Sequence, residues 1–429
     1  MTPDSARNIE FVGHSDLNGR GDGVQIMVHK GHAFIGHMFS DGFTVTDVRD
    51  PRNPRPVNFT PAPPNSRAFH LQTHDDLLLT VNSPNIWVLQ GYSDANDYFK
   101  ASITETFTKR DKEFTAGLRV FDISKPESPR EIGFMPVDGL GLHRLWYVGG
   151  RYAYASCHWQ GFTDHVLAII DMAEPTRPEV VGRFWLPGMN QAAGETPSWT
   201  GRRYALHHAI VAGNLAYAAW RDGGMTILDV ADPTAPKLLA HRNWSPPFGG
   251  GTHTPLPLPD RNLAVFADEG NLDNCANGIQ RCWVFDVREP TNPVQISAFP
   301  TPAEQDYCKK GAKFGPHNLH ENRPGSFQSS ELIFATYQNA GVRVVDIRDP
   351  FAPKEVAHFV PPAPEKMVDP RPNRPRIIQS NDVYVAPDGL MYLTDVNDRA
   401  KINPVRQEFF GAARPASTLI GVAALALPA

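Results

Sequence analysis

The sequence predicts an all-β protein built from repeated four-stranded units. Three observations support this prediction: a fourteen-residue pattern that recurs six times, a spacing between copies that suits about four short strands, and a composition rich in turn-forming residues. There are 40 prolines and 34 glycines among 429 residues, but hydrophobic residues make up 41% of the chain and recur in strand-length runs. The prolines and glycines therefore indicate tight turns rather than disorder.

The recurring pattern is clearest at 226–239, which reads TILDVADPTAPKLL. An apolar run ends in an aspartate and one more apolar residue, and two prolines three positions apart follow before a second apolar run. β-branched and aromatic residues favour strands, and proline ends a strand because it cannot donate to the ladder. The pattern therefore predicts a hairpin whose aspartate accepts hydrogen bonds from turn amides, a structural role. The six aspartates are Asp47, Asp122, Asp171, Asp229, Asp286 and Asp346.

The spacing of these aspartates, 49 to 75 residues, favours one closed and repetitive domain over several unlike ones. A unit of that length holds about four short strands, which is a propeller blade. We therefore predict a seven-bladed β-propeller over residues 1–429. The first blade covers about 24–60, and the next five begin near His70, Leu142, Leu206, Thr252 and Pro316.

The two ends of the chain are predicted to share the last blade. Residues 8–14 are similar to the run that follows the second proline in other copies, such as 130–134 and 179–184. The degenerate last blade, about 377–429, lacks the Asp-Pro pattern. A closing N-terminal strand would remove the exposed sheet edge. The polar and aromatic segment 91–115 accounts for the longest spacing and is predicted to be a loop or small excursion in the second blade.

This apolar–Asp–apolar–x–[Asp/Glu]–Pro–x–x–Pro pattern resembles the LVIVD repeat, whose proteins are predicted β-propellers. The resemblance covers nearly the whole chain and implies the propeller fold. It implies little about activity, because propellers host unrelated functions.

Charge and composition exclude several classes of partner. The net charge is −5 and the basic residues are scattered, so nucleic acid is not an expected partner. The N-terminus has no apolar signal-like region and no run has the length of a membrane span, so we expect a cytoplasmic protein. Its four cysteines, which lack a paired metal spacing, are then expected to be free thiols; a Cys275–Cys282 bridge is conceivable only after export.

Five of the 16 histidines occupy the same register, at the start of the innermost strand of successive blades. Since innermost strands line the central axis, these side chains should converge at one mouth of the channel. The predicted metal ligands are His143, His207, His253 and His317, and His70 is a fifth candidate. His208 would replace His207 if the register differed by one, because adjacent strand residues face opposite ways.

Imidazoles without thiolates suit iron(II), manganese, copper or zinc. Iron(II) is favoured, because catalytic zinc rarely has more than three histidine ligands. The arrangement is similar in architecture to the four-histidine iron site of carotenoid cleavage oxygenases and to the selenium-binding or methanethiol oxidase propellers. A catalytic site would also keep one coordination position open for water or substrate.

A second ring of polar residues is expected where the second strand of each blade returns to the same face. These residues differ from blade to blade, as an asymmetric substrate pocket requires. The candidates for catalysis or for orienting the histidines are His70, His158, His208, Arg221, Asp268, Glu269 and Glu321. Arg221 is suited to hold a substrate carboxylate or phenolate.

The leading hypothesis is a metal-dependent enzyme that acts on a small organic substrate by oxidative cleavage or by hydrolysis or lyase chemistry. The main alternative is a non-catalytic scaffold for protein partners, in which the histidines only satisfy turn carbonyls. A third hypothesis is a metal-free hydrolase or isomerase with His158 or His208 as base beside Asp268. No membrane partner is expected, and homo-oligomers stay open.

Overall fold

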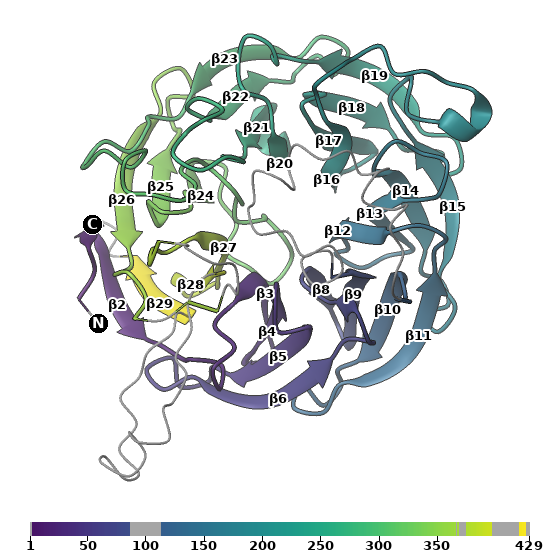
Figure 1. Cartoon of the computed structure of the whole chain (residues 1–429). Helices are drawn as coiled ribbons and strands as arrows, with labels where there is room; N and C mark the ends of the chain where they lie inside the picture. Colours follow the sequence, from purple (N-terminus) through teal and green to yellow (C-terminus); the bar gives the residue numbers. More distant parts are fainter. Residues whose placement is uncertain (1, 86–112, 366, 369–374, 397–419, 426–429) are drawn as a thin grey trace.

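The computed structural model describes residues 2–85, 113–365, 367–368, 375–396 and 420–425. Within these ranges the chain is almost entirely β, and its antiparallel sheets, which we divide into seven units of mostly four strands, follow one another around a central axis (Figure 1). The all-β, propeller-type prediction is confirmed. The predicted insertion at 91–115 lies almost wholly outside the described residues.

The first four units run in chain order from the innermost strand to the outermost. Unit one contains β3 (Gly23–His29), β4 (His32–His37), β5 (Gly42–Asp47) and β6 (Arg55–Pro61). Unit two contains β7 (Ser66–Arg67), β8 (Leu71–His74), β9 (Leu77–Pro84), β10 (Gly117–Asp122) and β11 (Arg130–Pro136). Unit three contains β12 (Gly141–Trp146), β13 (Tyr152–His158), β14 (Val166–Asp171) and β15 (Glu179–Phe184). Unit four contains β16 (Tyr204–Ala212), β17 (Leu215–Arg221), β18 (Met225–Asp229) and β19 (Lys237–Arg242).

The last three units complete the ring. Unit five contains β20 (Thr252–Leu258), β21 (Leu263–Asp268), β22 (Cys282–Asp286) and β23 (Val294–Ala298). Unit six contains β24 (Leu332–Thr336), β25 (Val342–Asp346) and β26 (Lys354–Val360); residues 317–320 take the innermost place by bonding to β24. Unit seven contains β27 (Ser380–Val385), β28 (Leu390–Asp395) and β29 (Ile420–Leu425). Two short 3-10 helices, η1 (Gln191–Ala193) and η2 (Pro259–Arg261), lie in connections.

The N-terminal segment joins two units instead of one. Strand β2 (Ile9–Gly13) pairs antiparallel with β29 and becomes the outermost strand of unit seven. The preceding β1 (Ser5–Arg7) pairs with β26 of unit six. Figure 1 shows the N-terminal strand lying beside the last strands of the chain.

The six repeat aspartates make one common hydrogen bond at the outer turns. In each copy Oδ1 accepts from the backbone N–H two residues further on, at 2.9 to 3.1 Å. The predicted structural role of these aspartates is therefore confirmed.

Glycines of the outermost strands fit neighbouring turns closely. A Cβ on Gly182 would lie 1.9 Å from the Pro233 carbonyl oxygen, and one on Gly133 would lie 2.6 Å from that of Pro175. Gly13 of β2 stands in the same relation to Pro51 of unit one, at 2.1 Å. The glycine after one hairpin thus accommodates the Asp-Pro or Glu-Pro turn of the next unit, including where the chain ends meet.

Apolar side chains fill the space between adjacent units. The cluster between units five and six, for example, contains Val265, Val284, Ala335 and Val345, all buried. Each sheet is therefore covered on both faces by its neighbours, which leaves the axis to be lined by the ends of the innermost strands.

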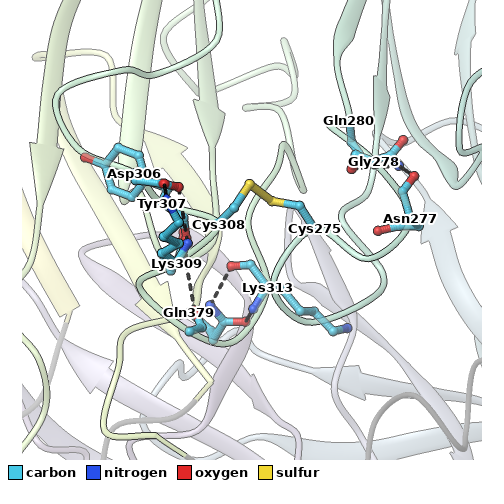
Figure 2. The surroundings of a disulfide bond; sticks show 12 residues. Cys275, Asn277, Gly278, Gln280, Asp306, Tyr307, Cys308, Lys309, Lys313 and Gln379 are labelled. Carbon is cyan, nitrogen blue, oxygen red and sulfur yellow. Dashed lines mark hydrogen bonds and ion pairs between the residues drawn. A yellow bond between two sulfur atoms is a disulfide. The ribbon is translucent and has the colours of Figure 1, made fainter.

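The cysteines differ from the prediction. Cys275 and Cys308 form a disulfide (Figure 2). Cys157 and Cys282 are free and buried. The free-thiol prediction is wrong for the first pair, and the alternative Cys275–Cys282 pairing is wrong as well. The bond joins two irregular segments of unit five, 269–281 and 299–316, whose proximity the repeat pattern does not reveal. No helix in the described ranges is long and apolar enough to cross a membrane.

Candidate metal centre

β-bulges aim the ends of the innermost strands at the axis. The pairing register shifts between Leu142 and Arg144, between Tyr204 and His208, and between Thr252 and Thr254. A bulge adds one residue to a strand and re-aims the side chains next to it. His143, His207 and His253 lie in these three bulges, and each is followed by a polar residue close to the axis.

The five histidines in register lie side by side around the axis, as predicted; we call them the axial histidines. Ring centroids are 5.0 Å apart for His70 and His143, and 4.7 Å apart for His143 and His207. They are 3.5 Å apart for His207 and His253, which stack, and 4.4 Å apart for His253 and His317. The arc thus spans units two to six.

Most axial histidines bond through Nδ1 to the backbone carbonyl of the equivalent residue in the next unit. His70 bonds to the carbonyl of His143, His207 to that of His253 at 2.8 Å, and His317 to that of Asn381 at 2.7 Å. His253 reaches the His317 carbonyl through the Thr254 hydroxyl, with steps of 2.8 and 3.2 Å. A carbonyl only accepts hydrogen bonds, so Nδ1 carries the proton and Nε2 keeps its lone pair.

In unit seven an asparagine takes the same position. Asn381 Nδ2 donates to the Val24 carbonyl of unit one at 3.0 Å, which continues the same chain of bonds. An amide therefore suffices for the link between units. The histidines add something the link does not need, namely a second ring nitrogen with a lone pair.

The axial imidazoles are neutral in this environment. Burial, reinforced by neighbouring positive charges, holds the pKa values of His70, His207 and His253 well below the ordinary 6.5, and burial lowers that of His317 to about 4. A neutral imidazole with its proton fixed on the other nitrogen is the form that binds a metal ion.

Glu269 supplies a carboxylate to this group. Its oxygens lie 3.7 Å from His253 Nε2 and 3.7 Å from His317 Nε2. It also pairs with Arg221 and, at 3.7 Å, with Lys313 Nζ. Burial favours the neutral acid, but these two cations outweigh it and lower the pKa of Glu269 to about 2, so the group is anionic.

The spacing of His253, Glu269 and His317 fits a single ion. One ligand atom from each lies within 4.8 Å of the others. With metal–ligand bonds of about 2.1 Å, tetrahedral ligands are about 3.4 Å apart, and each imidazole Nε2 lies 3.7 Å from a different oxygen of Glu269. The predicted ligands His253 and His317 are thus brought together with Glu269, which was predicted as a catalytic or orienting residue and not as a ligand. His207 stacks on His253, and His143 and His70 continue the arc; Nε2 of His143 is buried with no hydrogen-bond partner among the described residues.

A second set of polar side chains, from residues that follow the axial histidines in the chain, gathers around Glu321; we call it the inner cluster. Glu321 Oε1 accepts from Arg144 Nη2 at 3.0 Å, and Oε2 accepts from Gln72 Nε2 at 3.0 Å. His208 Nε2 and Arg323 Nη1 each lie 3.8 Å from this carboxylate. His207 and His208 therefore both face the axis region, one in each layer, because the bulge removes the strict alternation.

Two predicted residues do not join the axial group. Asp268 accepts from the indoles of Trp244 and Trp283 and from the Thr252 hydroxyl, and burial raises its pKa to about 7. His158 bonds to the Leu140 amide and the Phe162 carbonyl. Both act as anchors for surrounding loops.

The sequence did not single out His165 or Lys313. The His165 ring lies 5.7 Å from that of His143, and its Nδ1 bonds to Asp164 at 2.7 Å. Both residues lie in connections outside the repeat register. The Asp-His dipeptide at 164–165 is the one sequence signal that points to His165.

A further group of potential ligands, Glu304, Glu355 and His358, lies beside β26, away from the axial group. Arg343 Nη1 already pairs with Glu304 at 2.7 Å and with Glu355 at 3.3 Å. Unlike the axial group, this one is not buried as a whole, because Glu304 is exposed.

Comparison with known proteins supports the fold and the repeat. The LVIVD repeat matches residues 208–241. The Myceliophteria thermophila Cps50 (Swd1) beta-propeller domain is similar with a TM-score of 0.52 and 9% identity, covering 90% of this chain and 95% of that one. The periplasmic gluconolactonase PpgL of Pseudomonas aeruginosa has a TM-score of 0.51 and 12% identity, covering 92% and 95%. A protein from Lactobacillus plantarum has a TM-score of 0.50 and 10% identity, covering 86% and 89%.

At these identities the likeness shows the fold alone. No curated protein matches the chain. The chain is thus a β-propeller protein that carries an LVIVD repeat. The similarity to four-histidine oxygenase and methanethiol oxidase propellers stays a prediction.

Proposed function

We propose that His253, His317 and Glu269 bind a divalent metal ion and that the chain is a metal-dependent enzyme acting on a small organic substrate at the ring axis. The observation that carries this proposal is the convergence of two Nε2 lone pairs and one anionic carboxylate. The protons of both imidazoles are fixed on the far nitrogen, and all three groups are buried.

The carboxylate changes the choice of metal. The preference for iron(II) assumed an all-histidine set, whereas two histidines and one carboxylate are shared by non-haem iron(II) centres and by catalytic zinc. Among hydrolysis, lyase chemistry and oxidative cleavage, we favour hydrolysis. Arg221 and Lys313 stand next to the ligands as fixed positive charges, which suits a developing oxyanion.

When bound, a divalent metal would lower the pKa of a coordinated water towards neutrality and polarise a carbonyl. The residues of the chain hold this arrangement in place. The Thr254 hydroxyl fixes the His253 tautomer, the Asn381 carbonyl fixes that of His317, and Arg221 holds Glu269 ionised. The fold likeness to a gluconolactonase allows hydrolysis without singling it out.

Oxidative cleavage is a second candidate because the same ligand set is the facial triad of non-haem iron(II) enzymes. The identity of the metal separates the two. The scaffold alternative predicts that no metal binds at the axis.

The test is metal content by plasma mass spectrometry, on protein purified without an affinity tag and after reconstitution with zinc, iron(II) or manganese under anaerobic conditions. The informative variants are His253→Asn, His317→Asn and Glu269→Gln. Asparagine at these positions can keep the bond between units that Asn381 makes, while removing the Nε2 ligand. The control is His241→Asn, whose ring bonds to the Gly223 carbonyl away from the axial group.

We expect about one equivalent of metal in the wild type and in H241N, and at least a tenfold loss of metal affinity in each of the three axial variants. Ester and lactone hydrolysis and oxygen consumption are then measured on the loaded protein. Folded wild-type protein that takes up no metal would overturn the proposal, as would axial variants that bind it as well as wild type.

A further inference from the structure

The charges at the axis do not balance. Glu269 is shared by two cations, Arg221 and Lys313. Glu321 of the inner cluster is likewise shared by two cations, Arg144 at 3.0 Å and Arg323 at 3.8 Å. Asp382 lies next to the inner cluster, but burial raises its pKa to about 7, so it offsets only part of a charge at neutral pH. Each layer therefore retains surplus positive charge, and a bound metal would add to it.

The two inner arginines differ in how completely the protein satisfies them. Arg323 donates to the Gln72 side chain and to the backbone carbonyls of Thr73 and Tyr147. Arg144 uses only Nη2, on Glu321; its Nε and Nη1 are buried and have no hydrogen-bond partner within the described part of the chain. Its relative exposure is 0%.

Buried guanidinium N–H groups without partners are costly, and buried polar groups in folded proteins are nearly always hydrogen-bonded. The neighbouring His208 is buried as well, and its Nε2 lies 3.8 Å from a Glu321 oxygen.

Arg144 also lies close to the candidate metal centre. It directly follows His143 in the bulge of β12. Burial is the main cause of the low pKa values of His70, His207 and His317, and the positive charge of Arg144 contributes to each of them. An anion bound to Arg144 would therefore interact electrostatically with the axial histidines.

We propose that the axis takes an anionic ligand, a small carboxylate, whose oxygens accept from the free N–H groups of Arg144. As the substrate class of the centre described above, this inference rests on the proposed function. A carboxylate would supply the missing acceptors, offset the surplus positive charge and place the rest of the ligand beside His253, His317 and Glu269. Arg144 would then be a binding and specificity-determining residue, while Arg323 is structural.

The test compares matched pairs of ligands by isothermal titration: benzoate with benzamide and acetate with acetamide. Each is titrated into metal-free protein prepared by chelation and into metal-loaded protein. The variants are Arg144→Lys, which keeps the cation beside Glu321, and Arg144→Gln. The control is Arg288→Gln, a change of an exposed arginine paired with Asp286 at the rim.

We expect each carboxylate to bind wild type and R288Q at least roughly tenfold more tightly than its amide, and both Arg144 variants to lose roughly tenfold or more of that affinity. Equal binding of acid and amide, or no binding of carboxylate to folded wild type, would overturn the inference and assign ordered water to Arg144. Carboxylate binding to protein that takes up no metal would reject the proposed function alone. Metal uptake without carboxylate binding would reject this inference alone.

Discussion

The repeat places one polar side chain at the outer turn and, in six units, a histidine or asparagine at the axis, and the two positions behave differently. At the outer turn the aspartate bonds to an amide two residues away in its own hairpin, and all six copies make the same bond. At the axis the side chain bonds to the next unit, so its free atoms face those of its neighbours. A hydrogen bond within one hairpin leaves the six aspartates apart from one another. A hydrogen bond to the next unit instead places side chains of several units beside one another, where they can form one site.

Carboxylates also have different surroundings in the two regions. Around the rim, carboxylates lie beside exposed arginines and turn amides, and the pKa of Asp122 is lowered to about 2 by the Ser124 amide and hydroxyl and by Arg130. In the inner cluster Glu321 is buried among groups from units two, three and four. Variants in the two regions should therefore differ in the size and in the sign of their effects on stability.

Removing the inner carboxylate should cost the most stability. Glu321→Ala leaves Arg144 and Arg323 buried without their common counter-charge, and breaking such a buried pair costs about 3–5 kcal/mol. Urea denaturation of the variant measures the loss. The control is Glu179→Ala, which removes an exposed carboxylate at the start of β15 and should stay within about 0.5 kcal/mol of wild type. A loss as small as that of the control would show that the inner cluster is not a coupled network.

Breaking the disulfide should come next. The double variant Cys275→Ser/Cys308→Ser is expected to lose about 2–4 kcal/mol, because the bond closes a separation of 33 residues. The bonded segments follow Glu269 and precede Lys313, so metal affinity should fall too. Unfolding and metal titration with and without reductant measure both effects.

An unchanged midpoint in wild-type protein after full reduction of the disulfide would contradict this prediction. The predicted cytoplasmic location stays a prediction, and a disulfide of this kind is typical of oxidising compartments.

The pH dependence of stability should differ in sign between the two regions. Burial raises the pKa of Asp382 to about 7. The contribution of this carboxyl to the free energy of unfolding is therefore present at low pH and is lost as pH rises from about 4 through about 7. Between pH 5 and pH 8 the free energy of unfolding of Asp382→Asn should therefore rise by on the order of 2 kcal/mol relative to that of wild type. Its amide oxygen can still accept from the Ile26 N–H.

At the rim the sign is reversed. The lowered pKa of Asp122 contributes stability above about pH 4 that disappears as pH falls through about 2. Asp122→Asn should therefore be less stable than wild type at neutral pH and equal to it in acid. Denaturation curves of both variants across pH check the pair, and a shift of the same sign in both would contradict the contrast.

A single repeat aspartate should contribute the least. Asp229 accepts from the Ala231 amide, and no ion pair is recorded for it in the described ranges, so Asp229→Ala isolates the turn bond. We expect a loss of about 1 kcal/mol, the size typical of side-chain caps on backbone amides, with metal content unchanged. Thermal unfolding and metal analysis of the same sample check both parts; a loss of metal would mean that the rim and the axis are coupled.

The sequence predicts the fold well because each unit carries its own local signals. These are the turn aspartate and the glycine that leaves room for the turn of the next unit, as Gly182 leaves room for Pro233. The axial histidines could be predicted for the same reason, since register is conserved by the repeat. Other features of the site depend on departures from the repeat. The bulge at 204–208 brings both His207 and His208 to the axis region, where simple alternation allows one.

The remaining parts of the site come from segments without periodicity. Glu269 and Asp268 are adjacent at the end of β21, but Glu269 lies beside the histidines whereas Asp268 accepts hydrogen bonds from two indoles. The orientation of Asp268 thus depends on Trp244 and Trp283. His165, Lys313 and the Cys275–Cys308 bond lie in irregular connections. Their positions follow from tertiary contacts that no local pattern records.

The central claim is that the axis, and not the rim, is the metal-binding region. Its most direct test is an anomalous difference map from crystals of the metal-loaded protein, recorded at the absorption edge of the bound metal. We expect one strong peak within about 2.0–2.3 Å of Nε2 of His253, Nε2 of His317 and a carboxylate oxygen of Glu269. A peak at the outer-turn aspartates or at Glu304 and Glu355, with none at the axis, would contradict it.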